Sequence, residues 1–271
     1  MDLATIIGMV LCIGLVLYGI MSGDDGPAAL GNFLDGQSAL ITIGGTLGSV
    51  LMANKLKDFM NGLKGFLLAI KQSKTNQQEV IKKIIELSNV ARKEGLLALE
   101  EAASDIDDPF MKKGILLIVD ATEPELVRSI LETELSCIEQ RHKKVTAVWD
   151  NIAAMGPAWG MVGTLIGLIN MLKHLEDVSS VGPNMSVALV TTLYGSLLAN
   201  WIATPVANKL RINNSEEIAI KEVMIEGLLS IQAGENPRVI EEKLKSFLSP
   251  KDRTSDSEDE GGETAGGGEQ A

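Results

Sequence analysis

The stretch Gly156-Pro-Ala-Trp-Gly-Met-Val-Gly-Thr-Leu-Ile-Gly-Leu168 decides the fold of this chain. It lies in an apolar segment, about Trp149 to Leu172, that carries no charged side chain through its core. A second segment of this kind runs from about Val181 to Ala207. Each is long enough to cross a bilayer, which takes about 20 helical residues. The two segments therefore predict a membrane protein.

Small residues form a stripe on the first of these segments. Gly156, Gly160, Gly163 and Gly167 follow one another at steps of four, three and four, which places them on one helical face. In lipid such a face usually marks close packing against another helix. Pro157 beside the stripe has no N–H, so it weakens the helix locally. The helix can bend there or bind something polar.

Three threonines lie at membrane depth in the same two segments. Thr164 belongs to the first, and Thr191 and Thr192 belong to the second. Threonine hydroxyls in membrane helices commonly bond back to a carbonyl of their own helix. Alternatively, three hydroxyls on two adjacent helices line a wet path. The sequence leaves both interpretations open.

The N-terminal half contains a matching pair of apolar runs, about Leu3 to Met21 and about Ala39 to Ala53, the second extended by Phe33 to Ser38. Four spans are therefore expected. The link Ser22 to Gln37 has acids and no Lys or Arg, whereas basic residues follow the second and fourth spans, which predicts cytoplasmic termini. The expected fold is all-α, polytopic, with four transmembrane helices and a helical cytoplasmic domain.

Five segments follow from this pattern. They are spans 1 and 2 (1–54), a cytoplasmic helical domain (55–148), spans 3 and 4 (149–207), C-terminal cytoplasmic helices (208–250) and an acidic tail (251–271) expected to be disordered. The formal net charge of −12 argues against nucleic acid as a partner.

Catalytic signatures are missing. The chain has no zinc-ligand spacing, phosphate-binding glycine loop or GxSxG turn, so neither an enzyme nor a metal site is expected. The four spans also have no clearly intramembrane Asp, Glu, Lys or Arg. Because ion relays generally need an ionisable group at membrane depth, another chain would have to supply the carboxylate if this protein conducts ions.

Dense charges mark the expected cytoplasmic domain. Arg92 and Lys93 precede Glu94, and Glu100 and Glu101 follow one helical stretch later. A solvated helical face is the usual explanation for such a pattern. A docking surface that uses charge complementarity is the alternative.

The runs Gly156 to Leu168, Val187 to Asn200, Ala91 to Glu101 and Ile231 to Ile240 together resemble the A subunit of the bacterial flagellar stator, the MotA/PomA family. The resemblance covers residues 1 to about 248. It implies a ring of five A subunits around two copies of a MotB/PomB-like B subunit, whose transmembrane helix carries an essential aspartate. It also implies that the glycine stripe and a kinked third span face the B helices.

Site roles follow from the resemblance position by position. Pro157 would lie near the B aspartate, Pro205 would close the fourth span, and Thr164, Thr191 and Thr192 would match hydroxyls around the ion path. Arg92, Lys93, Glu100 and Glu101 would match the charged residues that engage the rotor switch-complex protein FliG.

The resemblance predicts an ion-driven torque generator in the bacterial inner membrane, with no cofactor beyond the permeant H⁺ or Na⁺. The choice between the two ions stays open. One alternative is an energiser of outer-membrane processes of the ExbB/TolQ kind. Proteins of that kind usually have three spans, whereas four are expected here. A membrane scaffold without conduction is another.

Overall fold

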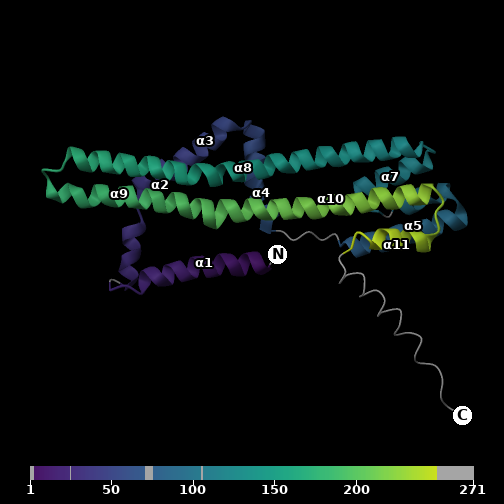
Figure 1. Cartoon of the computed structure of the whole chain (residues 1–271), viewed down its shortest axis with the longest axis horizontal. Helices are drawn as coiled ribbons and strands as arrows, with labels where there is room; N and C mark the ends of the chain where they lie inside the picture. The colour runs from purple at the N-terminus through teal and green to yellow at the C-terminus, as the bar shows by residue number, and fades with distance from the viewer. Residues whose placement is uncertain (1–2, 25, 71–75, 105, 249–271) are drawn as a thin grey trace, which may run out of the picture. The chain divides into compact units, whose positions relative to one another are not determined.

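The computed structural model describes residues 3–24, 26–70, 76–104 and 106–248 (Figure 1). Every regular element in these ranges is helical and none is a strand, which confirms the predicted all-α class. The expected disordered tail, 251–271, lies outside the described residues. The elements, in chain order, are α1 (Leu3–Met21), η1 (Gly26–Phe33), α2 (Gly36–Ala39), η2 (Leu40–Gly44), α3 (Gly45–Ala53), α4 (Leu56–Ile70), α5 (Gln77–Glu94), η3 (Leu96–Ala98), α6 (Leu99–Ser104), α7 (Pro109–Val119), α8 (Pro124–Lys173), α9 (Val178–Leu197), η4 (Leu198–Ala203), α10 (Thr204–Gln232) and α11 (Pro237–Lys245).

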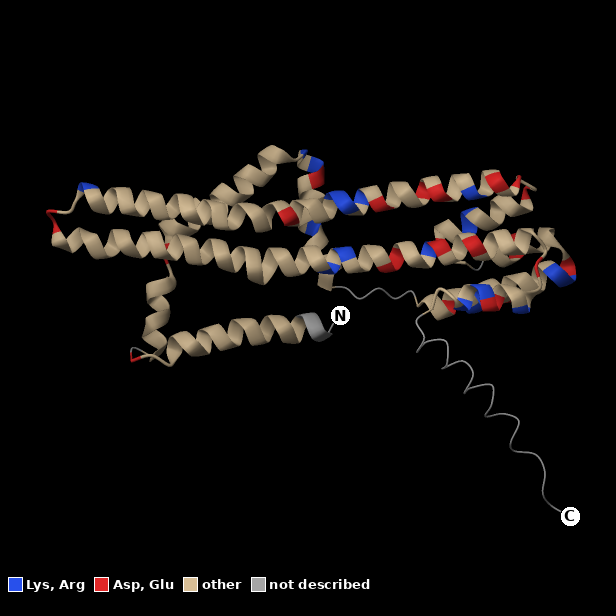
Figure 2. Ribbon diagram, in the orientation of Figure 1, with Lys and Arg blue, Asp and Glu red and all other residues tan. Residues whose placement is uncertain are grey.

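Three helical stretches are long and apolar enough to cross a membrane, namely Gly36–Ala53, Pro124–Lys173 and Val178–Gln232. A fourth candidate is the bent pair Ile6–Met21 and Gly26–Phe33. The second expected span begins at Gly36 rather than Phe33, because Asp35 caps the helix there. Neither α1 nor α9 carries Lys, Arg, Asp or Glu, as the tan ribbon in Figure 2 shows. The chain is thus a multi-pass membrane protein.

The chain divides into two compact units. Unit 1 comprises Met1–Gln72 and Gln140–Asn213, and unit 2 comprises Ser73–Glu139 and Asn214–Ala271. Each unit is assembled from two separate pieces of the sequence. The boundaries between the units fall inside α8 and α10, so each of these helices contributes residues to both units.

Unit 1 contains a small apolar core where α4 contacts α8. Gly62 lies under Val148 and Gly65 lies under Val145, so close that a Cβ at either glycine would lie 2.6 Å from the valine. Trp149 is buried between the helices, and its Nε1 donates to the Gly62 carbonyl oxygen at 2.8 Å. This bond satisfies the polar atom of a buried indole. The two glycines therefore let α4 approach the start of the third span.

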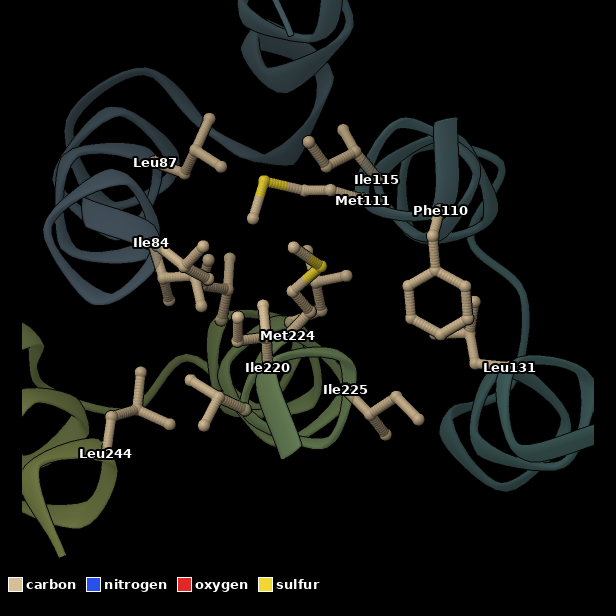
Figure 3. Packing of buried hydrophobic residues seen from close by; sticks show 14 of the residues in the cluster. Ile84, Leu87, Phe110, Met111, Ile115, Leu131, Ile220, Met224, Ile225 and Leu244 are labelled. Carbon is tan, nitrogen blue, oxygen red and sulfur yellow. The ribbon is translucent and has the colours of Figure 1, made fainter. Parts of the chain in front are cut away.

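Unit 2 has a larger core to which α5, α7, α8, α10 and α11 all contribute (Figure 3). Apolar residues recur at helical spacing on each of these helices, so each turns one face inward. The fully buried side chains include Ile84, Phe110, Leu131, Leu228 and Leu244. Gly114 makes room for Leu228, since a Cβ there would lie 2.5 Å from Leu228 Cδ1.

Charged groups at the edge of this core are paired. Arg128 Nη1 donates to Glu226 Oε1 at 2.8 Å, and Lys243 Nζ lies 3.3 Å from Glu226 Oε2. Burial raises the pKa of Glu226, but the hydrogen bonds from Arg128 and Lys243 outweigh burial and leave this pKa below its ordinary value. Lys221 is 7% exposed, and its Nζ lies 4.9 Å from the centre of the Phe110 ring.

Truncation of Leu131 tests the unit 2 core. Leu131 on α8 is fully buried, whereas Leu126 on the same helix is 52% exposed. We expect Leu131→Ala to lower the free energy of unfolding by about 2–5 kcal/mol, because it leaves a cavity. Leu126→Ala is the matched control and should change it by no more than about 0.5 kcal/mol. Denaturant unfolding of the purified full chain measures both. Equal effects of the two substitutions would contradict this account of the core.

Candidate functional site

The glycine stripe of α8 lies directly against α9. All four glycines are buried, and an added Cβ would meet α9 at each, at 2.9 Å for Gly156, 3.0 Å for Gly160, 2.5 Å for Gly163 and 2.7 Å for Gly167. At three of these positions the nearest atom is a backbone carbonyl oxygen of α9. The expectation that the stripe faces the helices of another subunit is therefore wrong, because α9 of the same chain already covers it.

The second span packs on a different side of α8. The Trp159 indole lies over Gly45, so closely that a Cβ at Gly45 would overlap the ring. Trp159 Nε1 also donates to Ser49 Oγ at 2.7 Å. Since Trp159 is about 70° from the centre of the stripe around the helix, α9 and the second span cover adjoining sides of α8. The flank beyond the stripe, away from Trp159, stays open.

Thr191 is fully buried, and its hydroxyl is satisfied within its own helix. Its Oγ1 donates to the carbonyl oxygens of Val187 and Ala188, each at 3.0 Å. The carbonyl oxygen of Thr191 accepts a bond from Thr42 Oγ1 of the second span at 3.3 Å. For this threonine the geometry is that of helix packing and not of a wet path.

Thr164 and Thr192 meet on the open flank instead. Their Oγ1 atoms lie 2.5 Å apart, and Thr164 Oγ1 also donates to the Ala188 carbonyl oxygen at 2.9 Å. Thr192 is exposed, and so is Pro157, which lies two helical turns before Thr164 on the same flank. The structure thus brings together Thr164 and Thr192, places Pro157 on the same flank about 10 Å along the helix, and separates Thr191 from them. α8 continues through Pro157 without interruption.

Pro205 lies elsewhere. It is exposed in the first turn of α10, directly after the π-helical segment η4. A proline lacks the N–H that would bond back along the helix, and such a gap often accompanies a widened turn. Pro205 is about 20 Å along the helix from Thr192, so it does not join the threonine pair.

A tyrosine ties the start of the second span to α9. Tyr194 Oη donates to the Phe33 carbonyl oxygen at 2.6 Å and accepts from the Asp35 backbone N–H at 3.1 Å. The Asp35 side chain accepts bonds from the hydroxyl of Ser38 and from its backbone N–H. The bond from the Ser38 hydroxyl is the main cause that holds the pKa of Asp35 below its ordinary value.

The charged residues expected to bind the rotor all lie in unit 2. Arg92 and Lys93 are exposed in the last turn of α5, and Glu100 and Glu101 are exposed in the first turn of α6. Basic residues at the end of a helix and acidic residues at the start of a helix also stabilise the helix dipoles. Helix stabilisation is therefore the alternative to rotor binding. The connection between the helices turns at Gly95, whose φ of +91° favours glycine. Leu97 in this connection is 74% exposed.

Several polar groups of the membrane helices were missed from the sequence. Ser38, Thr42 and Thr46 recur every four residues on the second span and are fully buried. Their spacing is the signal that would have marked a second small-residue packing face. Asp150 was also missed, because it stands at the very edge of the third span. The signal that would have marked it is its seven-residue spacing to Pro157, which places both residues on the same face of the helix.

Comparisons with known proteins agree with this architecture. Residues 102–223 match the family described as "MotA/TolQ/ExbB proton channel family". The chain is 43% identical to motility protein A of Borreliella burgdorferi over 97% of this chain and 100% of that protein. It is 38% identical to chemotaxis protein PomA of Vibrio alginolyticus, over 92% of this chain and 96% of that protein. The flagellar MotAB stator complex from Bacillus subtilis contains a similar chain, with a TM-score of 0.85, 33% identity, and coverage of 93% of this chain and 98% of that one.

A multi-pass helical protein with a hydroxyl pair on an open membrane flank, and with this family match, falls in the class of ion-channel subunits. Nearly full-length identity to motility proteins favours a stator over the energiser and scaffold alternatives. The chain belongs to the MotA/PomA family of flagellar motor stator A subunits, as predicted. It is accordingly a channel-family protein and not an enzyme.

Substitution at Gly195 tests the contact between α8 and α9. A Cβ at Gly195 would overlap the Gly156 carbonyl oxygen, whereas a Cβ at Gly48 of the second span would meet nothing within 4 Å. We expect Gly195→Ala to destabilise the protein by about 1–3 kcal/mol, because neither backbone can yield without a helix shift. Gly48→Ala is the control. Thermal stability of the detergent-purified chain and its amount in membranes are the measurements, and wild-type values for Gly195→Ala would refute the contact.

Proposed function

We propose that the chain forms, with a MotB/PomB-like B subunit, a complex of five A and two B subunits that converts H⁺ or Na⁺ flow into flagellar rotation. The complex would lie in the bacterial inner membrane with both termini of this chain in the cytoplasm. Support for the partner comes from the similar chain of Bacillus subtilis, which belongs to a flagellar MotAB stator complex. Support for the orientation comes from the Lys-rich segment after the second span.

The observation that carries the proposal is the Thr164–Thr192 pair, on the flank that also carries Pro157. Hydroxyl oxygens at membrane depth can accept a hydrogen bond from a protonated carboxyl group or replace part of a sodium ion's hydration shell. Residues 36–53, 151–172 and 178–203 contain no Asp or Glu. The site therefore suits a carboxylate that arrives from another chain, as the B subunit would provide.

In this mechanism, cation binding neutralises the B carboxylate and changes its affinity for the hydroxyl pair. Each passage of an ion then lets the ring of A subunits step around B. The membrane potential supplies about 2.3 kcal/mol per charge per 100 mV, so each step is small. Pro157 and the pair lie on the open flank of α8, where a partner helix can approach.

We further propose that Arg92, Lys93, Glu100 and Glu101 dock on the rotor protein FliG. All four are exposed, and the structure gives no ion pair for any of them among the described residues. Exposed Leu97 lies between the basic and the acidic pair in sequence. An exposed apolar side chain flanked in the sequence by charges of both signs is typical of a binding site that combines steering with a desolvated contact. The division into membrane segments 1–54 and 149–207 and cytoplasmic segments 55–148 and 208–250 belongs to the same proposal.

Removal of one hydroxyl tests the membrane site. Thr192→Val keeps the shape of the side chain and removes the partner of Thr164. We expect severalfold slower swimming at an unchanged amount of membrane protein, because the B carboxylate loses a hydroxyl partner. Thr46→Val is the matched control, since that hydroxyl bonds only to the Thr42 carbonyl oxygen of its own helix. Swimming should be measured with and without sodium and with a protonophore, which also identifies the ion. Wild-type swimming of Thr192→Val would contradict the site.

Charge reversal tests the rotor surface. Arg92→Glu should abolish or strongly impair rotation while the complex still assembles and conducts, because only docking is changed. Arg141→Glu reverses another exposed arginine and serves as the control. A compensating reversal on FliG should restore part of the motility. Loss of expression, or absence of rescue by every opposite charge on FliG, would instead favour a solvated helical face.

A further inference from the structure

One ion pair joins the third span to the helix that follows the fourth. Arg211 Nη2 on α10 donates to Asp150 Oδ1 on α8, and Arg211 Nη1 donates to Asn208 Oδ1 at 2.7 Å. The side chains of Asp150 and Arg211 are 43% and 51% exposed. All three residues belong to unit 1. The carboxylate is thus held in place by the guanidinium and remains half open to its surroundings.

Asp150 continues the flank of α8 that carries Pro157 and Thr164. The three residues are separated by seven-residue steps, and a straight helix drifts by only about 20° per such step. The glycine stripe lies about a quarter turn away, and Trp159 lies on the opposite side. Asp150 is therefore in line with the hydroxyl pair and about 21 Å nearer the expected cytoplasmic end.

The π-helical segment η4 aligns Arg211 with Thr192 in the same way. These two residues would lie about 100° apart around an uninterrupted α-helix. A π-turn inserts one residue and so rotates everything after it by about 100°. η4 (Leu198–Ala203) falls between the two residues. Arg211 therefore returns to the face of Thr192, and both polar pairs lie along one side of the joined helices.

We propose that Asp150 is the cation-accepting group at the cytoplasmic mouth of the ion path, and that Arg211 positions its carboxylate. This inference rests on the proposed function. Asp150 is the only Asp or Glu in residues 36–53, 149–172 and 178–203, so it is the first acid that a cation meets on this flank after leaving the B carboxylate.

The chemistry suits an exit more than a binding site. A carboxylate oxygen accepts H⁺ or Na⁺, and conduction requires that the ion also leaves readily. The guanidinium holds the carboxylate on this flank and leaves it half exposed, so a cation can reach it and leave again. The alternative is an ion pair that only holds the two helices together, called here a structural staple. An ion pair this exposed, however, contributes little to stability.

Substitution at Asp150 within the complete A–B complex tests the inference. Vesicles that contain the complex receive an imposed pH gradient or an imposed sodium gradient, and dyes for H⁺ and Na⁺ report flux per complex. We expect Asp150→Asn to lower this flux severalfold, with unchanged membrane level and co-purification of B. Asp150→Glu keeps a carboxylate and should retain most of the flux. Glu132→Gln is the control, since it removes an exposed carboxylate that pairs with Arg128 on the same helix.

Arg211→Gln supplies an independent measurement. Without the guanidinium the carboxylate loses its fixed position, so flux per complex should fall while the membrane level and the co-purification of B stay unchanged. If Asp150→Asn and Arg211→Gln reduce only the amount of complex, with normal flux per complex, the pair is a staple and the inference is overturned. Impaired flux in Thr192→Val together with normal flux in Asp150→Asn also overturns the inference and leaves the proposed function standing. Normal flux in both variants would overturn the threonine site as well as this inference, and absence of flux through the unsubstituted complex would overturn the proposed function itself.

Discussion

The membrane site of this chain depends on one contact, the approach of the α8 backbone to the α9 backbone. Gly156 and Gly195 face each other so closely that a Cβ on either would meet the carbonyl oxygen of the other. Lipid tails are as apolar as leucine side chains, so helices in a bilayer associate through close packing and dispersion and not through the hydrophobic effect. Because no side chain separates the two backbones, the relative register of the helices is fixed. That register is what places the Thr164 hydroxyl against the Thr192 hydroxyl.

Polar groups at membrane depth then fall into two kinds. The hydroxyls of Thr42, Thr46 and Thr191 are buried and bond to carbonyl oxygens of their own or a neighbouring helix. They satisfy hydrogen bonds that lipid cannot, and they leave no oxygen directed outward. Thr164 and Thr192 also have protein partners, but they remain on the open flank of the helix pair. Two neighbouring threonines in the sequence thus have different surroundings, because adjacent helical residues point about 100° apart.

The sequence predicted the helices well, because apolar runs, glycine spacing and turn residues are local signals. The stripe of four glycines correctly indicated a packed helical face. The helix that covers this face was assigned to another subunit, because the sequence does not say which helix covers a stripe. It also could not separate Thr191 from Thr192, because that distinction requires the position of the second span. Asp150 escaped notice because it stands at the very edge of the third span, and because its partner, Arg211, follows a whole further span and a π-turn.

The weakness of the hydroxyl contacts is a condition for the proposed motor. Side-chain hydrogen bonds between membrane helices contribute on average about 0.6 kcal/mol and at most about 1.7 kcal/mol. One ion crossing 100 mV releases about 2.3 kcal/mol, which is the same order. In the proposed motor, a fixed positive charge in place of Thr164 or Thr192 would bind the B carboxylate far more strongly than one ion can reverse. A pair of neutral hydroxyls would keep the bound and released states close in free energy, so that the cation decides between them.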